Sequence, residues 1–260
     1  MSWPVAESYR KRSVPYPWKL DPNTKTLKRD GKLILDDSDA YGVEMALQLV
    51  TAAGGGEVTL VSMAPNNEVS GLRTGLAMGA AKAILVSDEA LAGSDALSTA
   101  KVLGAAIKRA EPDLVIAGTE STDGYTGTVP EQIAAVLGFA SVTFAKKIEV
   151  ADGTVKVERQ TEAGYDECEA PLPAVVSVTA GVVEPRYPSF KGIMAAKSKP
   201  VDQVAVGDLG LSADQVGANG ARQEIVNVAP AEERQAGEIV EDDGEGHLKI
   251  IEFLKNQKVL

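Results

Sequence analysis

The stretch that most constrains the fold is a short apolar run at residues 114–117, followed by a polar loop and a helical pattern. Its β-branched residues are typical of a strand that is buried on both faces of a sheet. Pro130 suits the first turn of a helix, because its missing N–H would have no partner within the helix there. Ile133 and Leu137 continue the apolar face of that helix. The stretch therefore predicts a strand, a loop and a helix in that order.

The loop between this strand and this helix is rich in glycine and in hydroxyl groups. It contains Gly118, Thr119, Glu120, Ser121, Thr122, Asp123, Gly124, Tyr125, Thr126 and Gly127, and Thr128 or Val129 would cap the helix. Glycine lets a backbone approach a ligand closely, and hydroxyls and helix N-terminal amides can donate to phosphate oxygens. One interpretation is a nucleotide-binding loop. The other is an ordinary strand-to-helix loop, because the same residues are common in turns.

Strand and helix patterns alternate through the first half of the chain. Apolar runs at 57–62 and 83–86 predict two buried strands, and capping residues predict helices that begin near 36–39, 66–67 and 94–95. This alternation predicts an α/β fold with a parallel-dominated twisted sheet and helices on both faces, a Rossmann-like arrangement of the adenine-nucleotide-binding type. Ligands bind such sheets outside the carboxyl ends of the strands, where Met63 and the 118–128 loop would share an edge. Core packing, the commoner use of a methionine, stays the alternative for Met63.

The pattern changes after residue 138. Strand-like residues on both sides of Asp152 and Gly153 predict a hairpin, and residues 171–179 predict a further buried strand, so this half would extend the sheet with antiparallel pieces. Periodicity is weak over 200–244, and residues 248–254 predict a short amphipathic helix that must dock on another surface. We expect an α/β nucleotide-binding domain over 1–200, with a divergent stretch at 1–18, and a C-terminal arm over 201–260.

Composition narrows the function. The net charge of −11 argues against nucleic acid as the main partner, because phosphate binding needs a basic face. One cysteine, Cys168, fits a reducing compartment, so we expect a cytoplasmic protein. We expect neither membrane insertion nor a secretory signal, because no suitable apolar run is present. His247 is the only histidine, so the usual catalytic triads and zinc sites lack their residues, which favours a carrier or binding protein.

The segment 184–199 is unusually basic for so acidic a chain. It carries two prolines, the aromatic side chains of Tyr187 and Phe190, and four basic side chains, namely Arg186, Lys191, Lys197 and Lys199. We interpret it as a loop in which Phe190 is an exposed anchor of the kind used in protein contacts. The alternative is a loop that folds onto its own core.

Taken together, these segments resemble the beta subunit of electron transfer flavoproteins over roughly residues 19–260. The likeness rests on LDPNTKTLKRDG, YGVEMALQLV, GLRTGLAMGAAKAILVSD, GTESTDGYTGTVPEQIA and EPRYPSFKGIMAAKSK. It implies a heterodimer with an alpha subunit, with FAD held mostly by the alpha subunit and AMP held structurally by the beta subunit. Electrons would pass from acyl-CoA dehydrogenases and similar partners of fatty acid oxidation to a membrane quinone oxidoreductase. The chain would then be an electron carrier rather than an enzyme.

The resemblance also implies roles for residues of this sequence. Those implied to contact AMP are Asp36, Asp37, Ser38, Asp39, Met63 and the loop Gly118, Thr119, Glu120, Ser121, Thr122, Asp123, Gly124, Tyr125, Thr126, Gly127 and Thr128. Those implied to contact dehydrogenases are Tyr187, Phe190, Lys191, Ile193 and Met194. The C-terminal arm is implied to reach the alpha subunit.

Two departures from the family concern the nucleotide. The family's first strand is normally a continuous apolar run before a Val-Pro motif, whereas Val14 and Pro15 here follow a polar, basic stretch, so the nucleotide contact on that strand has no clear counterpart. Asp36 and Asp37 carry negative charge where the family often has neutral residues. Since they would repel a phosphate, we expect them near the ribose or adenine, or facing solvent.

Two other functions stay open. A bifurcating flavoprotein would hold a second FAD, which accepts hydride from NADH, in place of AMP. A stand-alone ATP-binding stress-type protein of the same broad fold would need a triphosphate-binding glycine pattern, which the spacing of Gly118, Gly124 and Gly127 fits poorly.

Overall fold

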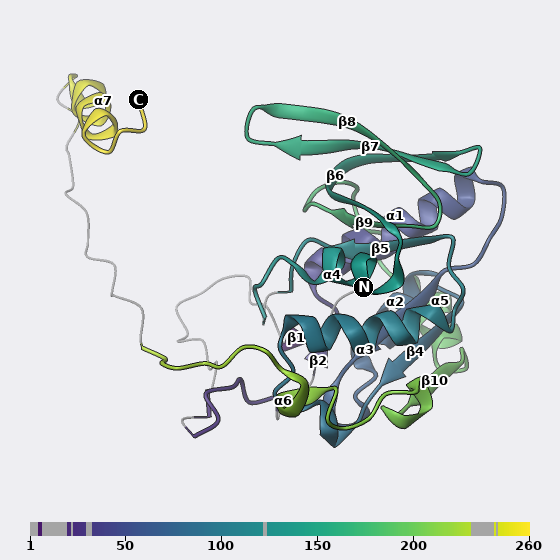
Figure 1. The fold of residues 1–260 in the computed structure, drawn as a ribbon. Helices are drawn as coiled ribbons and strands as arrows, with labels where there is room; N and C mark the ends of the chain where they lie inside the picture. Colours follow the sequence, from purple (N-terminus) through teal and green to yellow (C-terminus); the bar gives the residue numbers. More distant parts are fainter. Residues whose placement is uncertain are drawn as a thin grey trace. The chain divides into compact units, whose positions relative to one another are not determined.

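The computed structural model describes residues 5–6, 20–21, 23–29, 33–121, 124–229, 242 and 244–260 (Figure 1). Contacts divide the chain into two compact units, Met1–Ile225 and Val226–Leu260. The second unit carries the helix α7 (Gly246–Asn256), which was predicted from its amphipathic pattern. Most of the expected divergent stretch at 1–18 lies outside the described residues; within it, β1 (Val5–Ala6) pairs antiparallel with β2 (Leu33–Ile34).

One sheet of the first unit is parallel and has three strands. Its order is β10 (Val201–Val204), β4 (Lys82–Val86) and β3 (Thr59–Met63), with Val61 opposite Ile84. Three helices lie between the strands along the chain: α1 (Asp37–Ala52) before β3, α2 (Ser70–Met78) before β4, and α3 (Ala96–Lys108) after it. The predicted α/β class with parallel strands is confirmed.

The other large sheet has five strands and is mixed. Its order is β5 (Leu114–Gly118), β9 (Ala174–Val178), β6 (Ala140–Ala151), β7 (Thr154–Thr161) and β8 (Gly164–Pro171). The first three strands are parallel, and β6, β7 and β8 form an antiparallel meander. The predicted hairpin is confirmed, because Asp152 and Gly153 turn between β6 and β7 with φ of 51° and 73°.

The sequence patterns missed three features of this fold. β8 is an edge strand with mostly polar, exposed residues, so it lacks the apolar alternation that marks a strand. β10 is only four residues long, and it lies in the stretch that we expected to be extended. The segment 184–199 was expected to be a loop, but α5 (Phe190–Ala196) forms within it because Ser189 Oγ accepts from Gly192 N at 3.1 Å.

The predicted cap of α2 was also wrong. Asn66 and Asn67 have left-handed backbones in the short turn Pro65–Asn67, and α2 begins later, after Val69. Glu68 Oε1 accepts a hydrogen bond from Ser70 N at 2.7 Å and so takes over the capping role. The remaining short elements are the turns Glu89–Leu91 and Gly207–Leu209 and the helix α6 (Gly217–Gly220).

The two faces of β3 contribute to different parts of the core. Val61 and Met63 pack with α3 and with α4 (Val129–Leu137), whereas Leu60 packs with Leu72 and Leu76 of α2. Helices therefore cover the strand on both faces, as the parallel pattern predicted. No helix among the described residues has both the length and the apolar character needed to cross a bilayer.

Candidate functional site

The end of β5 meets the start of α1, which brings two of the predicted nucleotide-binding stretches together. A Cβ built on Gly118 would lie 3.1 Å from Ser38 Cβ and 3.5 Å from Asp39 Oδ1. This contact is tighter than most side chains tolerate, so glycine at the strand end permits the close approach. The residues around 36–39 and the loop after β5 therefore share one region of the carboxyl edge.

The acidic residues at the start of α1 differ in their surroundings. Asp36 is buried and caps its own helix, because its Oδ1 accepts a hydrogen bond from Ser38 N at 2.7 Å. Asp39 is buried one turn later, whereas Asp37 is exposed to solvent. Asp37 is thus the carboxylate of the three that solvent screens most.

Hydroxyl groups bond the described residues of the loop between β5 and α4 to one another and to β9. Thr119 Oγ1 donates to the carbonyl of Val178 at 2.9 Å, which ties the loop to the end of β9. Ser121 accepts from Gly124 N at 3.2 Å through its hydroxyl and from Tyr125 N at 2.9 Å through its carbonyl. Thr122 and Asp123 lie outside the described residues. Glu120 is partly buried, and a Cβ on Gly127 would lie 3.4 Å from its Oε2.

The N-terminus of α4 follows the loop directly. Thr128 occupies the cap position, its side chain makes no capping bond to the helix amides, and Thr126 beside it is exposed. Pro130 lies within the first turn, as the sequence predicted. The first N–H groups of a helix have no intrahelical partner, and the dipole favours an anion there by about 0.3–1 kcal/mol. This end of α4 can therefore bind a phosphate or a carboxylate.

Met63 ends β3 at the same edge, but its side chain is 1% exposed and lies in the core with Val61 and Val86. Its backbone leads into the turn at Asn66 and Asn67, where Asn67 N donates to Ser87 Oγ at 3.0 Å. Met63 thus belongs to the core that β3 shares with α3 and α4, and it does not face solvent.

A second candidate surface is the docking segment, which we define as residues 184–199. Its apolar side chains are unusually exposed: Tyr187 is 93% and Phe190 81% exposed, and Ile193 and Met194 are about half exposed. Lys191 is exposed beside them. These five residues are exposed on one short helix and the turn before it, where a partner can reach them.

The base of the docking segment is fixed to α2. Arg73 Nη1 donates to the carbonyls of Ala196 at 2.6 Å and Lys199 at 2.8 Å. Lys199 Nζ in turn donates to Leu76 O at 2.8 Å and Ala80 O at 2.6 Å, at the C-terminal end of α2. A cation at this end also complements the helix dipole. The segment is therefore an apolar surface on a rigid base.

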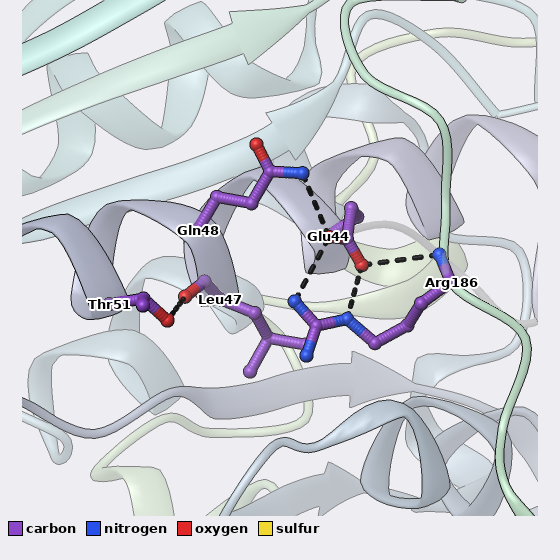
Figure 2. Close-up of polar contacts among 5 residues, drawn as sticks. All are labelled: Glu44, Leu47, Gln48, Thr51 and Arg186. Carbon is purple, nitrogen blue, oxygen red and sulfur yellow. Dashed lines mark hydrogen bonds and ion pairs between the residues drawn. The ribbon is translucent and has the colours of Figure 1, made fainter.

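A buried carboxylate holds the other end of the docking segment (Figure 2). Glu44 in α1 accepts from Arg186 through Nε at 2.6 Å, Nη2 at 3.0 Å and the backbone N at 3.2 Å, and from Gln48 Nε2 at 2.9 Å. Burial would raise the pKa of Glu44, but the hydrogen bonds from Arg186 and Gln48 outweigh it, so the pKa lies below its ordinary value. The hydrogen bond to Glu44 raises the pKa of Arg186.

Sequence reasoning missed this pair and misjudged the charge of the segment. Two of its four basic side chains, Arg186 and Lys199, bond to groups of this same chain. The other two, Lys191 and Lys197, are exposed. The available signal was Glu44 itself, a carboxylate between Val43 and Met45 on a largely apolar stretch of α1. A charge in such a position is rarely buried without a partner.

Comparison with known proteins identifies relatives over nearly the whole chain. Residues 24–209 match the family model described as "Electron transfer flavoprotein domain". The chain is 40% identical over 258 residues to "Electron transfer flavoprotein subunit beta" of Mycobacterium bovis, covering 96% of this chain and 97% of that protein. It is 34% identical over 254 residues to the protein of the same description from Megasphaera elsdenii, covering 93% and 94%. It is 36% identical over 224 residues to "Caffeyl-CoA reductase-Etf complex subunit CarD" of Acetobacterium woodii, covering 85% and 86%.

Proposed function

The chain belongs to the electron transfer flavoprotein family as a beta subunit, and from that premise we propose that it forms a heterodimer with an alpha subunit, in which it binds AMP as a structural ligand. We further propose that the heterodimer carries electrons from acyl-CoA and related dehydrogenases to a membrane quinone reductase. The FAD that holds these electrons would be bound mostly by the alpha subunit. The C-terminal arm would dock on that subunit through α7, whose Leu248, Ile250 and Phe253 are exposed.

The observation that carries the AMP assignment is the meeting of α1, β5 and α4 at one carboxyl edge. The phosphate fits the N-terminus of α4, where Thr126 and Thr128 add hydroxyl groups and no side chain caps the helix amides. The ribose fits the acidic side, near Asp37, because a carboxylate accepts hydrogen bonds from hydroxyls and repels phosphate. Gly118 lets the start of α1 lie against the end of β5, which brings the acidic residues of α1 beside the loop.

Electron transfer needs no side chain that acts as a general acid or base, which fits a chain with a single histidine. The bound flavin supplies the redox chemistry, and the residues of this chain would hold the nucleotide and the partner. The docking segment suits a transient partner, because Phe190 offers an apolar anchor and Lys191 and Lys197 offer positive charge.

A bifurcating flavoprotein is the second candidate. The observation in its favour is the similarity to a subunit of a caffeyl-CoA reductase-Etf complex. In that case the site at the end of β5 would hold a second FAD in place of AMP. The charge pattern around the N-terminus of α4 suits either nucleotide, because both carry phosphate.

The test is to co-express the chain with its alpha subunit and to measure the nucleotides released when the purified complex is denatured. One FAD and one AMP per heterodimer support the first proposal, and two FAD support the second. A stable, colourless homodimer that releases no nucleotide contradicts both.

A matched pair of variants tests the site itself. Gly118→Val fills the space against Ser38 and should remove AMP while one FAD remains. Gly207→Ala is the control, because a Cβ there meets nothing within 4 Å and the backbone is not left-handed. Equal AMP content in both variants would contradict the assignment of the site.

A further inference from the structure

A short connector joins the candidate nucleotide site to the docking segment. We define the connector as residues 179–183, which follow β9 directly and lead into the docking segment at residue 184. Val178, the last residue of β9, pairs with Gly118, the last residue of β5. The connector therefore begins beside the loop that follows β5 and ends where the docking segment begins.

The start of the connector is bonded to this loop and to β6. Thr119 Oγ1, in the first residue of the loop, donates to the carbonyl of Val178 at 2.9 Å. Thr179 donates twice to the carbonyl of Ala145, from its backbone N at 3.1 Å and from Oγ1 at 3.3 Å. A movement of Thr119 is therefore passed to the carbonyl that precedes the connector.

The middle of the connector packs against α1. Val182 and Val183 lie against a buried cluster that contains Met45 of α1 and Val178 of β9. Closely packed side chains transmit a displacement to their neighbours. The connector is thus held between the end of β9 on one side and α1 on the other.

α1 itself lies directly on the end of β5. A Cβ built on Gly42 would lie 3.6 Å from Ile116 Cγ2 and 3.9 Å from Gly118 N, so the helix and the strand are in contact at this point. Glu44, two residues further along α1, accepts hydrogen bonds from Arg186 just beyond the connector (Figure 2). The helix therefore gives a second physical link between the end of β5 and the docking segment.

Two routes thus lead from the candidate nucleotide site to the docking segment. One passes through Thr119 and the connector, and the other passes through α1 and Glu44. They meet at Arg186, which is followed by the exposed side chains of Tyr187 and Phe190. Contiguous packed and hydrogen-bonded contacts of this kind can carry coupling between sites, and coupling that acts by restricting motion needs no change in the average structure.

We propose that the nucleotide regulates docking: AMP bound at the end of β5 strengthens the binding of a dehydrogenase to the docking segment. This inference rests on the proposed function, because it takes AMP as the ligand and a dehydrogenase as the partner. Bound AMP restricts the loop and the start of α1, so Tyr187 and Phe190 lose less conformational entropy when the partner binds. The coupling is reciprocal, so the dehydrogenase strengthens the binding of AMP by the same factor.

The test measures the affinity of the heterodimer for an acyl-CoA dehydrogenase, first after removal of AMP and then with saturating AMP. We expect AMP to raise this affinity about fivefold, at the lower end of the usual range for coupled sites. Equilibrium dialysis with labelled AMP should show the same factor when the dehydrogenase is added. A factor of one in both directions would overturn this inference alone. A heterodimer that binds no AMP would overturn the proposed function, and the inference with it.

Matched variants test the two routes at saturating AMP. Glu44→Gln removes the charge that holds Arg186, and Thr119→Val removes the bond to β9, so each should bring the coupling factor closer to one. Glu158→Gln is the control, because its carboxylate pairs with Lys147 at 3.3 Å on the meander, outside both routes, and it should keep the fivefold factor. An unchanged factor in the double variant Thr119→Val/Glu44→Gln would overturn the inference.

Hydrogen exchange distinguishes this coupling from a general gain in stability. The backbone N of Arg186 donates to Glu44 Oε2 at 3.2 Å, so AMP should slow exchange at this amide and at the amide of Tyr187. The amides of Asp202 and Val204 in β10, which belongs to the other sheet, should keep their rates. Equal slowing at both places, or no slowing at Arg186, would overturn the inference.

Discussion

The pair formed by Glu44 and Arg186 makes a prediction about the sign of a pH dependence. The side chain of Glu44 is 4% exposed and that of Arg186 is 44% exposed, so the two halves of the pair are not equivalent. Removing the guanidinium with Arg186→Ala leaves a buried carboxylate with Gln48 as its remaining side-chain donor. Removing the charge of the carboxylate with Glu44→Gln leaves a cation that can turn to water.

The magnitudes follow from this asymmetry. Removing one partner of a fully buried ion pair costs about 3–5 kcal/mol, and since Arg186 is nearly half exposed we expect about 2–3 kcal/mol for Arg186→Ala at pH 7. For Glu44→Gln we expect about 1 kcal/mol, the net value of an ordinary hydrogen bond. Both are measured as free energies of unfolding in urea.

The pH dependence should reverse between the wild type and Arg186→Ala. In the wild type the folded pKa of Glu44 is depressed, so its contribution is present above the ordinary value of 4.5 and is lost as the pH falls through the folded pKa. In Arg186→Ala burial is opposed only by the hydrogen bonds from Gln48 and from the backbone N–H of residue 186, so we expect the folded pKa of Glu44 to rise above its ordinary value. The destabilisation is then largest at neutral pH and diminishes as the pH falls.

The reference for both is the double variant Glu44→Gln/Arg186→Ala, which carries neither charge. The unfolding free energy of the double variant is subtracted from that of the wild type and from that of Arg186→Ala at each pH between 3.5 and 7.5, which removes the titration of all the other carboxylates. We expect the first difference to rise with pH and the second to fall with pH. Slopes of the same sign would refute the account of Glu44 as a buried carboxylate held in its charged form by Arg186.

Three further outcomes are expected. Phe190→Ala should weaken binding to an acyl-CoA dehydrogenase by about 1–2 kcal/mol in a titration, whereas Tyr165→Ala, which removes an exposed aromatic side chain elsewhere, should leave it unchanged. Gly192→Ala should lower both the unfolding temperature and dehydrogenase affinity, because its Cβ would clash with Ala77 O and push α5 away from α2; unchanged affinity would contradict the fixed base of the docking segment. Thr119→Val should lower the free energy of unfolding by about 1 kcal/mol, and it should weaken the binding of AMP, which calorimetry measures.

Much of the fold could be predicted because its signals are local. The apolar run at residues 114–117 and the proline at residue 130 were enough to predict β5 and α4, and Asp152 and Gly153 were enough to predict the hairpin. The caps of α1 and α3 were also evident, since Asp36 accepts a hydrogen bond from the amide two residues later and Asp95 from the amide three residues later. Each of these depends on residues close together in the chain.

The features that sequence patterns missed depend on contacts between distant residues. β10 exists because four residues at 201–204 pair with β4, more than 110 positions earlier in the chain. The charge balance of the docking segment depends on Glu44, which is 142 positions from Arg186. No local sequence pattern distinguishes a basic side chain that bonds to a buried carboxylate of the same chain from one that is exposed to solvent.

One helix connects the two surfaces to which we assign function. The start of α1 lies against Gly118 at the candidate nucleotide site, and Glu44, about two turns further along, holds Arg186 at the start of the docking segment. Residues of a helix move together, because each turn is bonded to the next. A nucleotide that orders the start of α1 would therefore also fix the position of Arg186 and of the exposed Tyr187 and Phe190 beside it. This gives a nucleotide without redox chemistry a physical role in docking, because a rigid anchor loses less conformational entropy when it binds.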